Sequence, residues 1–456
     1  MAAIVVLGLG MTGDAVLRWA HARGDAVLVL DDRVEAVDPG RLAVARGLGV
    51  EVAPAPVGPE ADALLGGVDL VVPSPGVPES HPVLRAAARA GVVCRSEVDL
   101  AAEMLEARGR RLVAVTGTNG KTTVTELTVA MCEASGVAAV AAGNIGAPLL
   151  DEAARRRDAL VVAEVSSFQL AHTTPAFRPD AAVILNVAED HLDWHRTFAG
   201  YAAAKARVFA GQHTGDLLVY NADDPVVAAL AGDARGRTVA FTLVDDAPAG
   251  ARVVHDATGR MLVAADGRPL VAVADLGAPA PHDLANALAA ACLALDVGAT
   301  PDGIARALRD FARGAHRVQT VAEIDGVRYV DDSKATNVHA ALAAIRGFER
   351  VVLVAGGRNK GLDLSPLRTA AHHLVGVVAI GDAADEVADA FAGAVPVVRA
   401  SSMAEAVRAA RDQARAAGGG VVLLSPACAS FDWYSSYAER GDDFAREVGR
   451  LAEVRR

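Results

Sequence analysis

The chain has 456 residues, which is enough for about three domains of typical size. Hydrophobic residues make up 52% and charged residues 22%, so the whole length is expected to fold, without long disordered tails. The formal charge of −12 argues against a broad binding surface for nucleic acid or for an anionic membrane. An anionic substrate therefore needs local lysine and arginine residues.

The first residues and the cysteines indicate the compartment. The opening MAAIVVLGLGMTG lacks a basic leading region and is interrupted by glycines, so it predicts a strand and a turn rather than a signal peptide. No other apolar run in the sequence is long enough to span a bilayer. The four cysteines form no Cys-x-x-Cys pair, which is typical of a reducing compartment and gives no metal framework. We expect a cytoplasmic protein without membrane insertion.

Short Val/Leu/Ile-rich runs alternate with longer Ala-rich stretches along most of the chain. This pattern predicts an α/β protein with parallel sheets covered by helices. Turns rich in glycine follow strands at 4–13, 112–121 and 351–361, and each such place is a candidate start of a separate α/β unit. We place boundaries within 99–111 and near Gly314, which gives domains of 1–105, 106–314 and 315–456. Residues 232–281 are expected to add antiparallel strands to the central domain.

The first turn matches the pattern G-x-G-x-x-G, with Gly8, Gly10 and Gly13, and Asp31 and Asp32 close the next strand. Such a turn binds the diphosphate of a nucleotide, so an NAD-dependent oxidoreductase is an alternative at this point. The pattern alone is weak, because its mechanics suit any diphosphate. The cation of Arg33 and a turn at 74–76 are predicted at the same sheet edge.

The sharpest motif is Gly-Thr-Asn-Gly-Lys-Thr-Thr at 117–123, between a strand and a helical stretch. Glycines let backbone N–H groups approach phosphate oxygens, Lys121 reaches the β- and γ-phosphates, and a Thr hydroxyl ligates Mg²⁺. The loop is shorter than the full G-x-x-x-x-G-K-[ST] spacing, since Val115 stands where an earlier glycine belongs. The motif predicts ATP binding.

Two polar residues follow apolar strands of the same region. Glu164 ends the strand ALVVAEV, and His191 lies just after the strand AAVILNV. Because the carboxyl ends of parallel strands meet at one edge, these side chains are predicted to face the phosphate loop and to hold Mg²⁺ with the substrate phosphates.

Three strand-following loops of the last third carry small or cationic residues: DDSKATN at 331–337, GGRNKG with Lys360, and SPACASFDWYSSYAERG from residue 425. They are interpreted either as a site for a second anionic reactant or as surface turns. Cys428 is expected to be a small buried residue rather than a nucleophile.

Taken together, these motifs resemble the Mur ligases, the ATP-dependent amide ligases of peptidoglycan precursor synthesis. The shared motifs run in order along nearly the whole chain: GLGMTG, DDR, SPG, GTNGKTT, GNIG, EVSSFQL, NVAEDHLDWH, YAAAKARVF, HDLANALAA, GAHR, DDSKATN, GGRNKG and SPACASFD. GTNGKT alone marks a wider group that includes folylpolyglutamate synthetases. DDSKATN with SPACASFD is similar to the branch that adds D-glutamate to UDP-N-acetylmuramoyl-L-alanine.

The resemblance implies three domains: a Rossmann-like unit for the uridine nucleotide, a central P-loop ATPase and a Rossmann-like unit for the amino acid. It implies a uridine-nucleotide site of Met11, Thr12, Asp32, Arg33 and Gly76. It implies a muramoyl-alanine site of Asn144, Ser166, Gln169 and His191. The implied ATP site contains Gly117, Thr118, Asn119, Gly120, Lys121, Thr122 and Thr123, completed by Asn286, Arg317 and Asp332. The implied D-glutamate site contains Lys334, Thr336, Lys360, Ser430 and Phe431.

The resemblance also implies two Mg²⁺ ions, one held by Thr122 and Glu164 and the other by His191 and a carbamylated Lys205. Lys121, Glu164, His191 and Lys205 then form the catalytic centre. Two positions depart from the family pattern. His282-Asp283 replaces a frequent His-Asn, which affects one nucleotide contact, and Tyr437 stands where a Phe can occur near the glutamate.

The implied reaction phosphorylates the L-alanine carboxylate with ATP, and the D-glutamate amine then displaces phosphate through a tetrahedral intermediate. This places the protein in cell-wall biogenesis, and hence in cell shape and division, as a monomer that binds neither nucleic acid nor membrane. A Mur-type ligase for another amino acid, an NAD-dependent oxidoreductase and a non-catalytic ATP-binding regulator are the alternatives.

Overall fold

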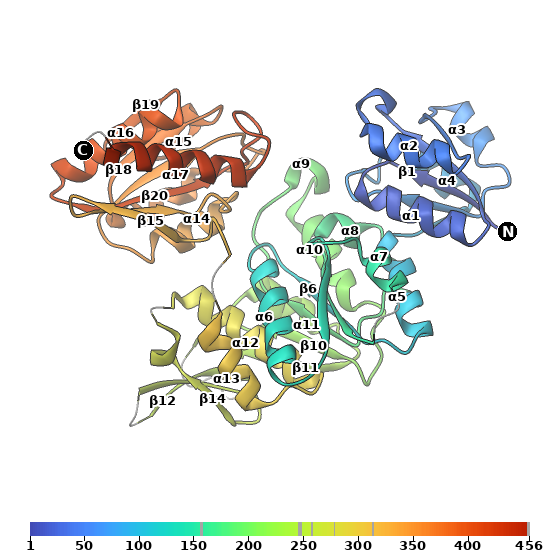
Figure 1. Cartoon of the computed structure of the whole chain (residues 1–456), viewed down its shortest axis with the longest axis horizontal. Coiled ribbons are helices and arrows are strands. Elements are labelled where there is room, and N and C mark those ends of the chain that lie inside the picture. The colour runs from blue at the N-terminus through green and yellow to red at the C-terminus, as the bar shows by residue number, and fades with distance from the viewer. Residues whose placement is uncertain (156–157, 245–248, 257–258, 278, 312–313, 454–456) are drawn as a thin grey trace. The chain divides into compact units, whose positions relative to one another are not determined.

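The computed structural model describes residues 1–155, 158–244, 249–256, 259–277, 279–311 and 314–453. Three sheets, each flanked by helices, confirm the predicted three-domain α/β class (Figure 1). By its contacts the chain forms two compact units: Met1–Val187 with Ala199–Phe311, and Ala188–Phe198 with the described residues from 314 onward. The domain limits proposed from the sequence stay predictions. In the described part of the chain, no helix combines the length and the apolar character needed to cross a membrane.

The first sheet contains five parallel strands in the order β3-β2-β1-β4-β5. The strands are β1 (Ala3–Leu7), β2 (Ala26–Asp31), β3 (Glu51–Pro54), β4 (Leu70–Pro73) and β5 (Val93–Cys94). The helices are α1 (Met11–Ala22), α2 (Pro39–Gly47), α3 (Pro59–Leu64), α4 (Pro82–Ala90) and α5 (Glu97–Ala107). Apolar residues occupy most positions of β1 and β4, as expected for strands covered on both faces.

The turn after β1 requires its glycines. A Cβ on Gly13 would lie 1.9 Å from the carbonyl oxygen of Gly8, and Gly8 has a φ of +91°. The Ser74 hydroxyl donates a hydrogen bond of 2.8 Å to that same oxygen. The turns after β1 and β4 therefore lie at one sheet edge, as the sequence predicts.

The second sheet has nine strands in the order β14-β13-β12-β11-β10-β9-β6-β8-β7. The strands are β6 (Leu112–Thr116), β7 (Ala139–Gly143), β8 (Leu160–Glu164), β9 (Ala181–Ile184), β10 (Leu217–Asn221), β11 (Arg237–Thr242), β12 (Ala251–Asp256), β13 (Gly259–Val263) and β14 (Pro269–Ala272). The helices are α6 (Lys121–Ala134), α7 (Leu149–Ala154), α8 (Ser167–Ala171), α10 (Phe198–Ala206), α11 (Pro225–Ala231), α12 (Pro281–Asp296) and α13 (Pro301–Asp310).

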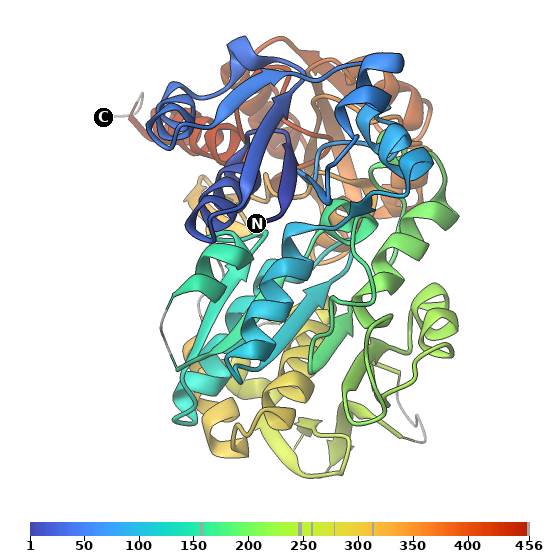
Figure 2. The ribbon, with the colours of Figure 1, turned by 90° about the vertical axis from the view of Figure 1, so that its right-hand side faces the viewer.

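The antiparallel extension predicted for 232–281 is correct only in part. Strand β12 pairs antiparallel with β13, and β13 with β14, at one edge of the central sheet, drawn near the bottom of Figure 2. Strand β11, however, pairs parallel with β10, and β12 pairs parallel with β11. The expectation was wrong for β11 because turn residues mark where a strand ends but do not fix the direction of its partner.

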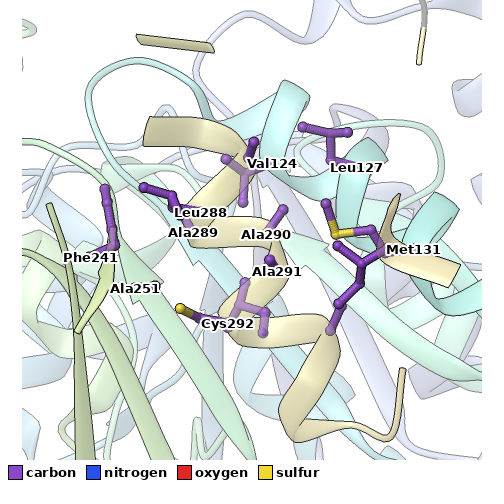
Figure 3. Packing of buried hydrophobic residues seen from close by; sticks show 14 of the residues in the cluster. Val124, Leu127, Met131, Phe241, Ala251, Leu288, Ala289, Ala290, Ala291 and Cys292 are labelled. Carbon is purple, nitrogen blue, oxygen red and sulfur yellow. The ribbon is translucent and has the colours of Figure 1, made fainter. Parts of the chain in front are cut away.

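The core beside this sheet is built where α6 and α12 pack together (Figure 3). Helix α6 contributes Val124, Leu127 and Met131, which recur on one face at intervals of three and four residues. The facing helix supplies Leu288 and the small residues 289–292, so the two helices can approach closely. Truncating Leu127 or Met131 to Ala is expected to cost about 2–5 kcal/mol of stability.

The third sheet has the order β15-β16-β20-β17-β18-β19, with β15 antiparallel and the other pairs parallel. The strands are β15 (Gln319–Ile324), β16 (Val327–Asp331), β17 (Val351–Gly356), β18 (Leu374–Ile380), β19 (Val397–Ala400) and β20 (Gly420–Ala427). The helices of this unit are α9 (Leu192–His195), α14 (Val338–Ile345), α15 (Ala384–Ala390), α16 (Met403–Ala416) and α17 (Tyr437–Glu453). Because β16, β20 and β17 are neighbours and parallel, the three loops singled out in the last third of the sequence leave one sheet edge together.

Candidate active site

The phosphate-loop motif lies between β6 and α6, as predicted. Gly120 has a φ of +87°, and a Cβ there would lie 2.5 Å from the side-chain oxygen of Asn286. Asn286 of α12 thus packs directly against the loop. The Lys121 ammonium donates hydrogen bonds to the carbonyl oxygens of Gly117 at 2.9 Å and Thr118 at 3.0 Å. Two carbonyl oxygens of the loop therefore hold the ammonium of its own lysine.

Asn186, which sequence reasoning missed, holds the loop from outside. Its backbone oxygen accepts from the Thr118 N–H at 2.9 Å, and its side-chain oxygen accepts from the Asn119 N–H at 2.8 Å. The Asn186 amide in turn donates to the Asn119 oxygen at 3.1 Å. A signal existed in the sequence, because Asn186 is the first polar residue after the β9 segment.

Lys205 and Tyr201 stand one helical turn apart on α10, and both are buried. The Lys205 ammonium donates to the Gly117 oxygen at 2.8 Å and lies 4.5 Å from the centre of the Tyr201 ring. The Tyr201 hydroxyl lies 3.0 Å from the Thr118 hydroxyl. The structure thus brings Lys205 to the phosphate loop, and Tyr201 is a second residue absent from the sequence prediction.

Glu164 ends β8, the strand next to β6, so it lies at the sheet edge from which the phosphate loop leaves. The Asn144 amide donates to Glu164 Oε1 at 2.7 Å, and the Asn144 N–H donates to the Glu164 backbone oxygen at 2.8 Å. Glu164 Oε2 is buried and has no hydrogen-bond partner among the groups that the structure describes. A buried carboxylate oxygen without a donor suits a bound cation, since Mg²⁺ prefers oxygen ligands.

The second predicted metal pair fits less directly. Lys205 as an ammonium is itself a cation and cannot ligate a metal, so only its carbamate has a suitable oxygen. His191 belongs to the second compact unit and Lys205 to the first, so their pairing stays a prediction. Among the described residues, no cluster of three or more His, Cys, Asp or Glu side chains is arranged to hold a metal ion.

At the edge of the first sheet, Asp31 has a structural role. Its carboxylate accepts from the Leu9 N–H at 2.8 Å and from the Arg33 N–H at 2.9 Å, which ties the two turns together. Asp32 Oδ1 lies 3.0 Å from His81 Nε2. Met11 is 62% exposed at the start of α1. The predicted uridine-nucleotide residues thus share one sheet edge, and their ligand stays a prediction.

Ser166 and Gln169 form the capping box of α8. The Ser166 N–H donates to Gln169 Oε1 at 2.9 Å, and the Gln169 N–H donates to Ser166 Oγ at 3.2 Å. The first role of both side chains is therefore to begin this helix. Their predicted contact with the muramoyl-alanine end rests on the resemblance alone.

In the second unit, the structure groups predicted residues at the edge of the third sheet. Lys334 Nζ donates to the Tyr437 hydroxyl at 3.1 Å and lies 4.5 Å from the centre of its ring. The hydroxyl group that Tyr437 has and a Phe lacks therefore accepts a hydrogen bond from Lys334, one of the residues predicted to bind D-glutamate. Ser430 is buried in the loop after β20, and Phe431 is 65% exposed. Thr336 lies in the loop between β16 and α14.

Arg440, which sequence reasoning missed, ties these loops together from α17. Its guanidinium donates to the Ser333 hydroxyl at 2.9 Å, to the Ser333 oxygen at 2.8 Å and to the Cys428 oxygen at 3.1 Å. The side chain is 1% exposed, and burial lowers the pKa of Arg440 to about 10. Arg440 thus braces two loops that carry predicted amino-acid-binding residues. Cys428 itself is buried, as expected, and burial raises the pKa of its thiol to about 12.

Asp332 follows β16 and is buried. Burial raises the pKa of Asp332 to about 7, and the hydrogen bond of 2.8 Å from the Ser425 hydroxyl opposes this rise. Arg317 is close enough for its charge to favour the ionised form. These two predicted nucleotide residues are therefore neighbours within the second unit.

Three family models match the chain in order: the Mur ligase MurD-like N-terminal domain at residues 2–96, the Mur ligase middle domain at 115–294, and the Mur ligase glutamate ligase domain at 316–428. Among solved structures, the chain is similar to MurF from Acinetobacter baumannii, with a TM-score of 0.61, 16% identity, and coverage of 97% of this chain and 93% of that chain. It is also similar to UDP-N-acetylmuramate-alanine ligase MurC from Thermotoga maritima, with a TM-score of 0.57, 18% identity, and coverage of 99% and 100%. At such identities these likenesses show the fold.

Curated sequence relatives have a higher identity to this chain than these solved structures have. The UDP-N-acetylmuramoylalanine–D-glutamate ligase of Frankia casuarinae is 47% identical, covering 98% of this chain and 93% of that protein. The enzyme of the same name from Thermobifida fusca is 44% identical, covering 98% of each chain. These relatives exclude the oxidoreductase and regulator alternatives: the chain belongs to the Mur ligase family, in the branch of the UDP-N-acetylmuramoylalanine–D-glutamate ligases.

Proposed function

We propose that this ligase joins D-glutamate to UDP-N-acetylmuramoyl-L-alanine with the cleavage of ATP. A carboxylate oxygen of the L-alanine end attacks the γ-phosphorus, and the bond to ADP breaks. The amine of D-glutamate then attacks the carbonyl carbon of the acyl phosphate, and inorganic phosphate leaves as the amide forms. The carrying observation is the phosphate loop beside Glu164, whose buried Oε2 lacks a partner among the described groups.

Within the first unit, three residues of the loop are given distinct tasks. Gly117 and Gly120 keep the backbone N–H groups open to phosphate oxygens, and Asn286 fixes the position of Gly120. Lys121 offsets the negative charge that gathers on the transferred phosphoryl group. Positioning and charge stabilisation are the main sources of rate in phosphoryl transfer.

Thr122 and Glu164 are the residues of this unit that would hold Mg²⁺. If bound there, such an ion would supply positive charge against the phosphate groups of ATP. Asn144 orients the Glu164 carboxylate by occupying Oε1, and Oε2 would be the oxygen available to a cation. For a second ion, His191 and Lys205 stay candidates, with Lys205 as the carbamate.

Within the second unit, Lys334, Thr336, Lys360, Ser430 and Phe431 are proposed to receive D-glutamate. Two lysines suit a substrate with two carboxylates. Asp332 and Arg317 are proposed to complete the ATP site. We place the reaction in the cytoplasm, on the chemistry of its substrates and on the free cysteines of the described chain. That the protein acts as a monomer stays a prediction.

The test is phosphate release from ATP and Mg²⁺ in the presence of UDP-N-acetylmuramoyl-L-alanine. D-Glutamate, L-glutamate, meso-diaminopimelate and no amino acid are compared. Release that depends on D-glutamate, with a product heavier by one glutamyl residue, is expected. Release with another amino acid would keep the mechanism and reject this substrate, and no release under any condition would reject the proposal.

A further inference from the structure

Residues Ala188–Phe198 lie between two strands of the central sheet in sequence, yet they form one compact unit with the C-terminal part of the chain. Asp190 is the buried acid of this loop. Its Oδ1 accepts from the Lys360 ammonium at 2.7 Å, and its Oδ2 accepts from the Asn337 amide at 3.2 Å. The carboxylate of Asp190 thus attaches this loop to two loops at the edge of the third sheet.

Both partners of Asp190 belong to the loops that carry the predicted D-glutamate residues. Lys360 lies in the loop after β17 and is itself one of these residues. Asn337 directly follows Thr336 and begins α14, because its Oδ1 accepts from the Ala340 N–H at 2.9 Å. One amide therefore caps a helix with its oxygen and holds Asp190 with its nitrogen.

Asp190 also shapes the backbone at His191. Its Oδ1 accepts from the His191 N–H at 2.9 Å, and Oδ2 lies 3.6 Å from His191 Nε2. His191 has a φ of +53°, a left-handed conformation that costs a non-glycine residue roughly 1–3 kcal/mol unless its surroundings hold it. The carboxylate of Asp190 is one such restraint.

The bond to Asp190 fixes the direction of Lys360. A lysine side chain has a flexible four-carbon stem, so its ammonium samples many positions unless a partner holds it. The ammonium has three N–H groups, and one bond to Asp190 leaves it able to donate to a substrate carboxylate as well. The side-chain pair is mostly buried, which strengthens it relative to a surface ion pair.

We propose that Asp190 is a positioning residue for the amino-acid substrate, which acts by holding Lys360 in place. This inference rests on the proposed function. It predicts that Asp190 affects D-glutamate through Lys360 rather than by touching the substrate. Removal of the charge should therefore act first on the KM for D-glutamate.

The test is a double-mutant cycle with D190N, K360M and D190N/K360M in the phosphate-release assay. D190N, which keeps the shape, is expected to raise the KM for D-glutamate about tenfold, with a change of less than twofold in the KM for ATP. If Asp190 acts through Lys360, the double variant has the D-glutamate KM of K360M within twofold. An unchanged KM in D190N, or effects that multiply in the double variant, would overturn the proposal.

Two further variants separate this role from a general loss of structure. N337S keeps a helix-capping side chain but removes the amide that reaches Asp190, so a smaller rise in the D-glutamate KM is expected. E189Q removes the charge of Glu189, the exposed residue before Asp190, and is expected to keep the wild-type KM for D-glutamate. If N337S leaves the KM for D-glutamate unchanged and D190N does not fold, the proposal is also contradicted. Absence of D-glutamate-dependent release in the wild type would instead reject the proposed function itself.

Discussion

The ammonium of Lys205 lies 4.5 Å from the centre of the Tyr201 ring and 2.8 Å from the carbonyl oxygen of Gly117. Tyr201 contacts the phosphate loop directly through the hydrogen bond of its hydroxyl with Thr118 at 3.0 Å. Its ring also packs against Lys205, which itself binds the loop. Two side chains on one face of α10 therefore hold the loop at Gly117 and Thr118.

Y201F removes the hydroxyl and keeps the ring beside Lys205. The Thr118 hydroxyl loses a buried partner, so a loss of about 1 kcal/mol is expected, measured as a fall in the thermal unfolding midpoint and a severalfold rise in the KM for ATP. Y220F, a change at a partly exposed tyrosine of β10, is the control. Equal values for Y201F and wild type would show that the hydroxyl does not hold the loop.

G120A places a methyl group against Asn286 in a backbone conformation of positive φ. We expect ATP binding, followed by titration calorimetry, to weaken at least tenfold, because both the strain and the 2.5 Å approach distort the loop. G109A is the matched control, since Gly109 also has a positive φ but a Cβ there meets nothing within 4 Å. Its cost should be only the strain of roughly 1–2 kcal/mol, with ATP affinity retained. Comparable ATP affinities in the two variants would contradict the predicted contact.

Glu97 at the start of α5 is a buried carboxyl whose Oε1 accepts from the Leu150 N–H. Burial raises the pKa of Glu97 from 4.5 to about 7. Between these values the unfolded chain has lost a proton that the folded protein keeps, so stability falls as pH rises through this window. The full difference corresponds to roughly 3 kcal/mol.

E97Q removes this titration. The unfolding midpoint of the wild type, relative to that of E97Q, is therefore expected to fall between pH 4.5 and pH 7 and to level off above it. E60Q, a change of an exposed glutamate on α3, should run parallel to the wild type. Parallel profiles of E97Q and wild type would rule out a protonated Glu97 in the folded protein.

R440K tests the brace between the loops of the third sheet. A lysine ammonium cannot reproduce the planar fork that bonds Ser333 twice and Cys428 once, so buried oxygens lose their partners. We expect a loss of about 3 kcal/mol of stability and a raised KM for D-glutamate, read from thermal unfolding and phosphate release. R446K lies on the same helix at an exposed position and should change neither. If R440K is destabilised but keeps the wild-type KM for D-glutamate, Arg440 contributes to stability and not to substrate binding.

Local patterns in the sequence predicted the phosphate loop and Glu164, because a strand, a glycine turn and a helix are neighbours along the chain. The sequence did not reveal Asn186, Tyr201 or Arg440, whose partners lie 67, 83 and 107 residues away. Nor did it fix the direction of β11, since pairing direction depends on the path of the connection and not on strand composition. Long-range contacts of this kind require the assembled sheet.

The loop at 188–198 has a mechanical consequence. The chain passes between the two compact units after Val187, again after Phe198 and a third time after Phe311. The second unit is therefore assembled from two separate stretches of chain. A break in the backbone on either side of 188–198 would leave this stretch attached to the second unit through the bonds of Asp190 to Lys360 and Asn337.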